Sequence, residues 1–180
     1  LDETPEHCRQ LKVPHPILTP QDMLRLRNAR HPDLVCRNID ILFPVPRQAR
    51  DGGDGQALEA ALDSVFVQAE QHIAEGAAIL VLTDRNLDAA RAPIPVLLAA
   101  SGLHHHLIRR GLRGAASLVV ETGEAREVIH FALLIAYGVS AICPYLAIAT
   151  VRSLAEQGLL DAATTPEEAD DVGRRSVLDQ

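Results

Sequence analysis

The stretch AAILVLTDRN, residues 77–86, is an unbroken apolar run that ends abruptly in polar residues. A strand of a parallel sheet is covered on both faces, so it lacks the apolar–polar alternation of a half-exposed strand. The chain has four such apolar runs, at 39–45, 77–84, 116–121 and 140–144. Each run is followed by a segment that we predict to be a helix, from the spacing of its apolar residues or from a glycine at its end. These segments are 56–75, 96–110, 123–138 and 145–158. The alternation predicts an α/β fold of consecutive βα units, whose parallel sheet of about four strands is either open or part of a barrel.

Residues 1–38 stand outside this alternation, and we expect them to form an N-terminal docking arm. Thr19 suits an N-cap, Pro20 suits the first helical position and Asp22 would lie in the first turn, so a short helix is predicted there. Residues 39–158 are assigned to the βα repeat. Residues 159–180 are acidic and have few apolar residues after Leu160, which indicates a tail or linker.

Composition limits the partners and the compartment. A formal charge of −7 argues against nucleic acid and anionic membranes as partners. No apolar run reaches the ~20 residues that span a bilayer. The first ten residues, LDETPEHCRQ, have neither the basic nor the apolar region of a signal peptide. They also lack an initiator Met, as expected for a fragment of a longer chain, which is one of two alternatives considered below. The three cysteines are far apart and form no CxxC pair, which is typical of a reduced, cytoplasmic protein with incidental thiols.

Three consecutive histidines, His104, His105 and His106, lie in the helix predicted at 96–110. Neighbouring helical residues are about 100° apart, so the three imidazoles fan around the helix and cannot converge on one ion. A helical metal site requires a spacing of three or four residues. We therefore expect His104 at the edge that faces the sheet, and His105 and His106 turned outward or toward a neighbouring domain.

Polar residues follow the predicted strands at their carboxyl ends, where open α/β sheets bind ligands. Asp84, Arg85 and Asn86 follow one strand, while Glu121 and Tyr145 follow the next two. This polar rim either neutralises itself and caps the following helices or binds a small molecule.

Two further residues, Asp88 and Arg91, extend the polar rim, and Arg85 is expected to bond to Asp84, Asp88 or Glu121. The chain has no GxSxG, P-loop or GxGxxG motif. We accordingly assign no catalytic, cofactor-binding or metal-ligating residue and expect the 180-residue chain alone to be inactive.

Five blocks carry a family resemblance: DRN at 84–86, APIPVLLA at 92–99, HHHLIRRGLR at 104–113, VVETGEARE at 119–127 and YGVSAICPYLA at 137–147. In this order and spacing they resemble the central domain of the glutamate synthase large subunit. The chain departs from the family pattern at Val139, Ser140 and Cys143, and it has Ile129 where a second histidine commonly precedes His130.

The resemblance implies a parent enzyme that makes L-glutamate from L-glutamine and 2-oxoglutarate. It also implies an amidotransferase domain before this segment and a barrel domain with FMN and an iron–sulfur cluster after it, both of them partners of a cofactor-free, noncatalytic linking domain. The histidines would then belong to a domain-packing surface. Two other hypotheses remain: a stand-alone α/β small-molecule-binding domain that uses the polar rim, and an independent enzyme. The chain is accordingly either a fragment of the synthase or a separately encoded relative.

Overall fold

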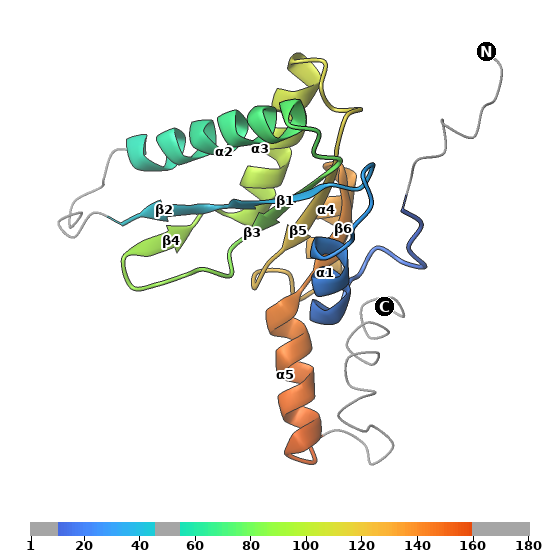
Figure 1. The fold of residues 1–180 in the computed structure, drawn as a ribbon. Coiled ribbons are helices and arrows are strands. Elements are labelled where there is room, and N and C mark those ends of the chain that lie inside the picture. Colours follow the sequence, from blue (N-terminus) through green and yellow to red (C-terminus); the bar gives the residue numbers. More distant parts are fainter. Residues whose placement is uncertain (1–10, 46–54, 160–180) are drawn as a thin grey trace.

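The computed structural model describes residues 11–45 and 55–159, and within them a parallel sheet has the strand order β1-β3-β5-β6 (Figure 1). Its strands are β1 (Cys36–Asp40), β3 (Ile79–Thr83), β5 (Ser117–Glu121) and β6 (Val139–Cys143). Within the described ranges no pairing joins β6 back to β1, so the sheet is open. The predicted α/β fold with a four-stranded parallel sheet is confirmed.

The strand order places three helices on one face of the sheet. Strands that follow one another along the chain are adjacent, so right-handed crossovers carry every connecting helix to the same side. These helices are α2 (Gln56–Ala74), α3 (Val96–Arg109) and α4 (Val128–Ala136). The last helix, α5 (Tyr145–Glu156), leaves the carboxyl end of β6 and extends away from the sheet, in orange in Figure 1.

Both faces of the sheet are buried, which explains the unbroken apolar run at β3. Leu80 and Leu82 pack into a large core beneath α2, α3 and α4. Ile79 and Val81 point to the other face, as the two-residue period of a strand requires. There they meet Met23 of α1 (Pro20–Arg27) and the chain before it.

The segment before α1 fastens the N-terminal arm across this second face. Thr19 caps the helix in a reciprocal capping box with Asp22, and Pro20 occupies the first helical position, as the sequence predicts. Just before the cap, Ile17 forms a parallel bridge with Ile142 of β6, and the Leu18 amide donates to the Ile142 carbonyl at 2.8 Å. The arm therefore runs from the β6 edge to α1, which contacts β1.

Three local features differ from the prediction. The run at 39–45, predicted as one strand, belongs to two strands. Strand β1 starts earlier, at Cys36, and ends at Asp40, and a separate strand β2 (Leu42–Pro44) follows it. That strand pairs antiparallel with β4 (Arg91–Pro93), which the sequence did not predict because three residues ending in proline give too little periodicity. Helix α4 begins at Val128 rather than near 123, since the Thr122 hydroxyl and the Gly123 amide are bonded to Asp84 instead.

Glycines end the helices where expected, with positive φ at Gly76, Gly111, Gly138 and Gly158. In the described part of the chain, no helix has the length and apolar character needed to cross a bilayer. The first ten residues of the predicted arm and residues 160–180 of the predicted tail lie outside the described residues.

Candidate functional site

Two carboxylates are buried where the strands end, and they organise the site. Glu121 ends β5 and Asp84 follows β3, and their residues are 1% and 4% exposed. Paired parallel strands bring these positions together, because Thr83 of β3 is opposite Glu121 in the register. A buried carboxylate requires charged or hydrogen-bonding partners to offset the lost hydration. We call the two carboxylates and the side chains that bond to them the carboxyl-edge cluster.

Glu121 accepts hydrogen bonds from three side chains. The Arg27 guanidinium of α1 donates to Oε2 at 2.6 Å, Arg85 Nε donates to Oε1 at 2.9 Å, and the Thr83 hydroxyl donates to Oε2 at 2.8 Å. Burial raises the pKa of Glu121, but the bonds from Arg27 and Thr83 outweigh it, so the pKa lies below its usual range. The bond to Glu121 correspondingly raises the pKa of Arg27. Glu121 is thus an ionised anchor to which the arm is attached.

Asp84 holds the loop after β5 and the start of α5. It accepts from the Thr122 hydroxyl at 2.6 Å, the Gly123 amide at 3.0 Å and the Tyr145 hydroxyl at 2.7 Å. Burial and the bond to Asp84 both raise the pKa of Tyr145. The Arg85 guanidinium carbon lies 4.5 Å from the centre of the Tyr145 ring, in a cation–π contact. Asp84 therefore joins β3, β5 and α5.

The remaining predicted rim residues are outside this cluster. The Asn86 amide donates to Asp40 at 3.0 Å, at the end of β1. Asp88 and Arg91 form an exposed ion pair at 2.7 Å, beside the short β2–β4 pairing. The structure therefore divides the predicted rim into a buried cluster and an exposed polar loop.

The three histidines contact different parts of the molecule, although the His104 and His105 rings also lie edge-on to each other with their centres 5.2 Å apart. His104 accepts from Arg113 Nε at 3.0 Å, and burial together with the charge of Arg113 lowers its pKa. His105 is exposed and meets the Tyr137 ring edge-on at 6.4 Å. His106 stacks on Phe66 with ring centres 4.6 Å apart and contacts a carboxylate of the same helix α2. In the part of the chain that the structure describes, no group of three metal-ligating side chains converges.

The sequence missed Arg27 and Thr83 as partners of Glu121, and Glu124 as a helix cap. Arg27 is one of several arginines near α1, and local spacing does not indicate which of them reaches a strand far along the chain. Glu124 accepts from the Val96 amide at 3.2 Å and so caps α3 from another loop. Glu124 and Val96 are 28 residues apart, so no local pattern indicates this cap.

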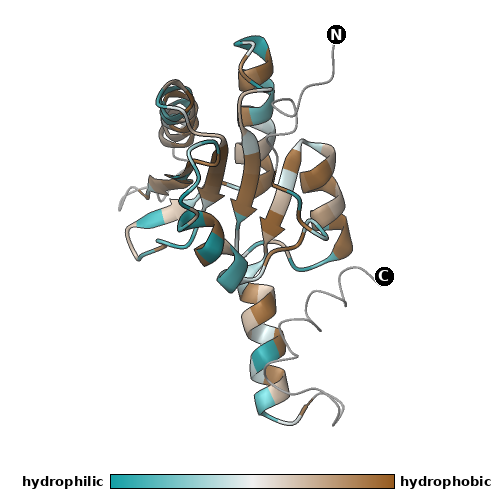
Figure 2. Ribbon diagram, turned by 45° about the vertical axis from the view of Figure 1, so that its right-hand side comes forward, coloured by the Kyte–Doolittle hydropathy of each residue, from teal (hydrophilic) through white to brown (hydrophobic). Residues whose placement is uncertain are grey.

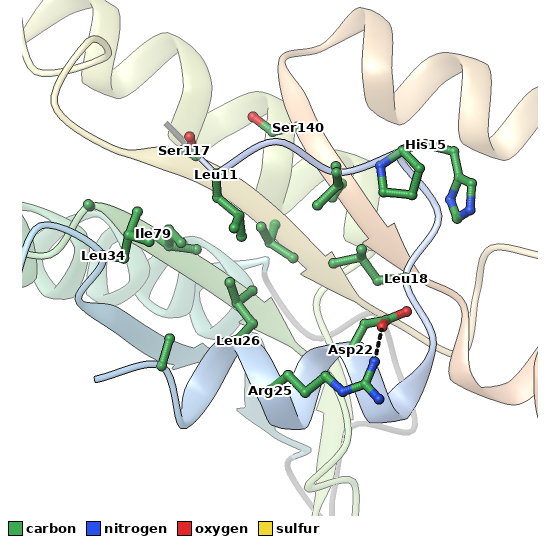
Figure 3. A pocket seen from close by; sticks show the side chains of 16 residues that line it. Leu11, His15, Leu18, Asp22, Arg25, Leu26, Leu34, Ile79, Ser117 and Ser140 are labelled. Carbon is green, nitrogen blue, oxygen red and sulfur yellow. Dashed lines mark hydrogen bonds and ion pairs between the residues drawn. The ribbon is translucent and has the colours of Figure 1, made fainter. Parts of the chain in front are cut away.

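A groove opens on the sheet face that the arm partly covers (Figure 3). Its volume is about 580 Å³, and it lies between the arm, α1 and the amino-terminal halves of the strands. Aliphatic side chains dominate its lining, including Leu26, Ile79 and Val119. Asp22 and Arg25 contribute a charged pair at one side, 3.4 Å apart. The groove is on a different part of the molecule from the predicted polar rim.

The described residues do not suit an iron–sulfur cluster, one of the two cofactors that the resemblance implies. An iron–sulfur cluster needs several cysteine thiolates. The described residues include two cysteines, Cys36 and Cys143, and nowhere among them do three metal-ligating side chains come together. At the N-terminus of α3, where a phosphate would favour free amides, the Glu124 carboxylate already binds the first amide and would repel an anion. The carboxylates of the carboxyl-edge cluster are thus bonded to other groups of the same chain.

A family model and the curated relatives of this chain all point to the same family. The family model for the glutamate synthase central domain matches residues 1–177. The NADPH glutamate synthase large chain of Bacillus subtilis is 43% identical over 161 residues, which are 89% of this chain and 10% of the relative. The NADH glutamate synthase of Schizosaccharomyces pombe is 36% identical over 94% of this chain and 8% of the relative. The ferredoxin-dependent glutamate synthase of Pyropia yezoensis is 39% identical over 84% of this chain and 9% of the relative. The chain thus spans about a tenth of the length of these relatives.

Proposed function

The chain belongs to the glutamate synthase central domain family, and from this we propose that it is a noncatalytic domain linking the amidotransferase and FMN-binding domains of a glutamate synthase. The whole polypeptide would make L-glutamate from L-glutamine and 2-oxoglutarate, in the cytoplasm. FMN and the iron–sulfur cluster would be held by the FMN-binding part, where they supply the reducing step. The residues of this chain would fix the spacing and orientation of the two catalytic parts.

The observation that supports this proposal most strongly is the internal pairing of the carboxyl-edge cluster. Ligand sites of open α/β sheets usually lie at this edge. Here Glu121 and Asp84 instead bond to the arm, to two strands and to the start of α5. Such a cluster fastens segments from both ends of the described chain to one sheet. A rigid connector needs this property, whereas a reactive site needs free polar groups.

The relatives support the same assignment from another direction. Their names give three different electron donors, NADPH, NADH and ferredoxin, yet each matches this segment at 36–43% identity. A segment that is shared across donors is not expected to bind any one of them.

The test uses the natural full-length polypeptide with Glu121→Gln, and it measures glutamine hydrolysis and glutamate formation separately. Loosening a linking domain should retain both partial reactions and raise the ratio of glutamine hydrolysed to glutamate formed. The exposed Asp88→Asn variant is the control and should leave the ratio unchanged. Complete loss of one partial reaction in a folded Glu121→Gln enzyme would assign a catalytic role and contradict the proposal.

A second candidate function is the binding of a small apolar molecule, and the groove of about 580 Å³ beneath the arm is the observation in its favour. A fluorescent naphthalene sulfonate is a suitable probe. If the groove binds it, Ser140→Trp, which fills the groove, should remove the binding, whereas Ser64→Trp on the exposed side of α2 should not. Equal probe binding by both variants would exclude this function.

A further inference from the structure

Helix α4 is apolar on every side, unlike the other helices of the sheet face. Its sequence is VIHFALLIA, with one polar side chain in nine residues. That side chain, His130, is used by the helix itself, because its Nδ1 accepts from the Arg126 and Glu127 amides, each at 3.2 Å. Phe131 and Leu134 are buried against the sheet core. The helix has no charged residue between its ends.

The side of α4 that faces away from the sheet is also apolar. Its large exposed side chains are 37–55% exposed, and Figure 2 shows most of this helix in brown. Together with two exposed alanines they form what we call the outer face of α4: Ile129, Ala132, Leu133, Ile135, Ala136 and Tyr137. A surface helix normally carries polar residues on this side, as α2 does with Glu59, Asp63 and Gln68. A helix that is apolar all round is typical of a buried position.

We propose that the outer face of α4 packs against an uncharged, apolar face of another domain of the same synthase polypeptide. This inference rests on the proposed function. The matched family is a central domain, and the matched segment makes up only 8–10% of the three relatives described above, so most of each polypeptide is available as a partner. A covalently linked domain is also present at a far higher effective concentration than a second copy of the chain.

Charged or polar residues at both ends of α4 mark the limits of the proposed interface. At one end of α4 the exposed Arg126 and Glu127 precede the helix, and at the other end exposed His105 lies edge-on against Tyr137. Between these ends the exposed side chains of the outer face are aliphatic or, at Tyr137, aromatic, so a charged partner surface would be desolvated there without compensation. The interdomain surface on this side is therefore α4 with His105, and His106 is turned toward α2 instead.

The test is cysteine labelling at two exposed alanines, Ala132→Cys on the outer face of α4 and Ala60→Cys on α2 as the matched control. A maleimide labels each variant in the 180-residue chain and in the full-length polypeptide, and peptide mass spectrometry reports the rate at each site. The natural Cys143 adds little background, since it is buried and its pKa is raised to about 12. Both introduced thiols should label rapidly in the 180-residue chain. In the full-length polypeptide, Ala132→Cys should label at least about tenfold more slowly while Ala60→Cys is unchanged.

Two results would overturn the inference. Rapid labelling of Ala132→Cys in a full-length enzyme that still makes glutamate would show that α4 is uncovered in a working synthase. Protection of Ala132→Cys in the 180-residue chain, together with a dimeric mass by light scattering, would assign the face to a second copy. Failure of the proposed function is separate, because it appears as complete loss of one partial reaction in the folded Glu121→Gln enzyme, whatever the labelling rates at α4.

Discussion

Replacing Arg27 by alanine tests whether one ion pair attaches the arm to the sheet. The Glu121 side chain is 2% exposed and the Arg27 side chain is 27% exposed, so their 2.6 Å contact is largely screened from water. Stranding a buried charge completely costs about 3–5 kcal/mol. Arg85 and Thr83 remain bonded to Glu121 in this variant, so the expected loss is smaller, about 2 kcal/mol.

The chain offers a closely matched control two residues earlier on the same helix. Arg25 pairs with Asp22 at 3.4 Å, but its side chain is 78% exposed. Arg25→Ala makes the same change in helix propensity and should cost less than about 0.5 kcal/mol. The difference between the two variants therefore isolates the pairing with Glu121 from the general effect of an Arg→Ala change in α1.

The assay is urea unfolding followed by circular dichroism at neutral pH. With a slope of about 2 kcal/mol per molar urea, the Arg27→Ala midpoint should fall by about 1 M, and the Arg25→Ala midpoint by less than about 0.3 M. Amide exchange in α1 should also accelerate in Arg27→Ala if the arm opens locally. Equal midpoints for the two variants, with unchanged exchange in α1, would refute the reasoning.

Three further predictions follow from named contacts. Arg85→Ala should lower the free energy of unfolding by about 1 kcal/mol, because the Arg85 side chain is 45% exposed and solvent weakens its pair with Glu121. A larger loss than that of Arg27→Ala in the same urea assay would contradict this prediction. Gly138→Ala should lower the free energy of unfolding by about 3 kcal/mol, since an added Cβ would overlap the His104 ring. Gly76 has nearly the same positive φ but open space around it, so Gly76→Ala should lower it by about 1 kcal/mol in the same assay. Similar losses in the two variants would disprove the contact with His104. The folded pKa of Glu121 is lowered, so its stabilisation is complete above the unfolded pKa of about 4.3 and is lost as pH falls through the folded pKa. The difference in unfolding free energy between wild type and Glu121→Gln should therefore shrink from neutral pH to about pH 3, and a constant difference would count against an ionised Glu121.

Much of the fold is predictable because the deciding signals are local. The run at β3 is apolar throughout since both of its faces are covered, and the glycines after α2, α3 and α4 adopt the positive φ that ends a helix. The capping box at Thr19 and Asp22 is likewise contained in four residues. Short elements are the exception. Strand β4 has three residues, and its pairing with β2 joins segments that are far apart in the sequence.

The site is less predictable because its contacts join distant segments. The carboxyl ends of β3 and β5 indicated that Asp84, Arg85 and Glu121 would be near one another, and Arg85 does pair with Glu121. The contact of Arg27 with Glu121 depends on how the arm crosses the other face of the sheet, and no local sequence pattern specifies that path. His106 shows the same limit, since helical geometry gives its direction but not that Phe66 of α2 lies there.

The path of the arm also constrains the order of events during synthesis. Pro16 and Leu18 bond to the backbone of Ile142, so this attachment cannot form until β6 has left the ribosome. At cellular rates of translation that interval is on the order of ten seconds. Throughout it, the growing sheet has an uncovered face, and the arm is available to chaperones or to wrong strand partners. A segment that is translated early is therefore placed late, and variants that weaken its attachment should lower the yield of folded chain in the cell more than their equilibrium stability implies.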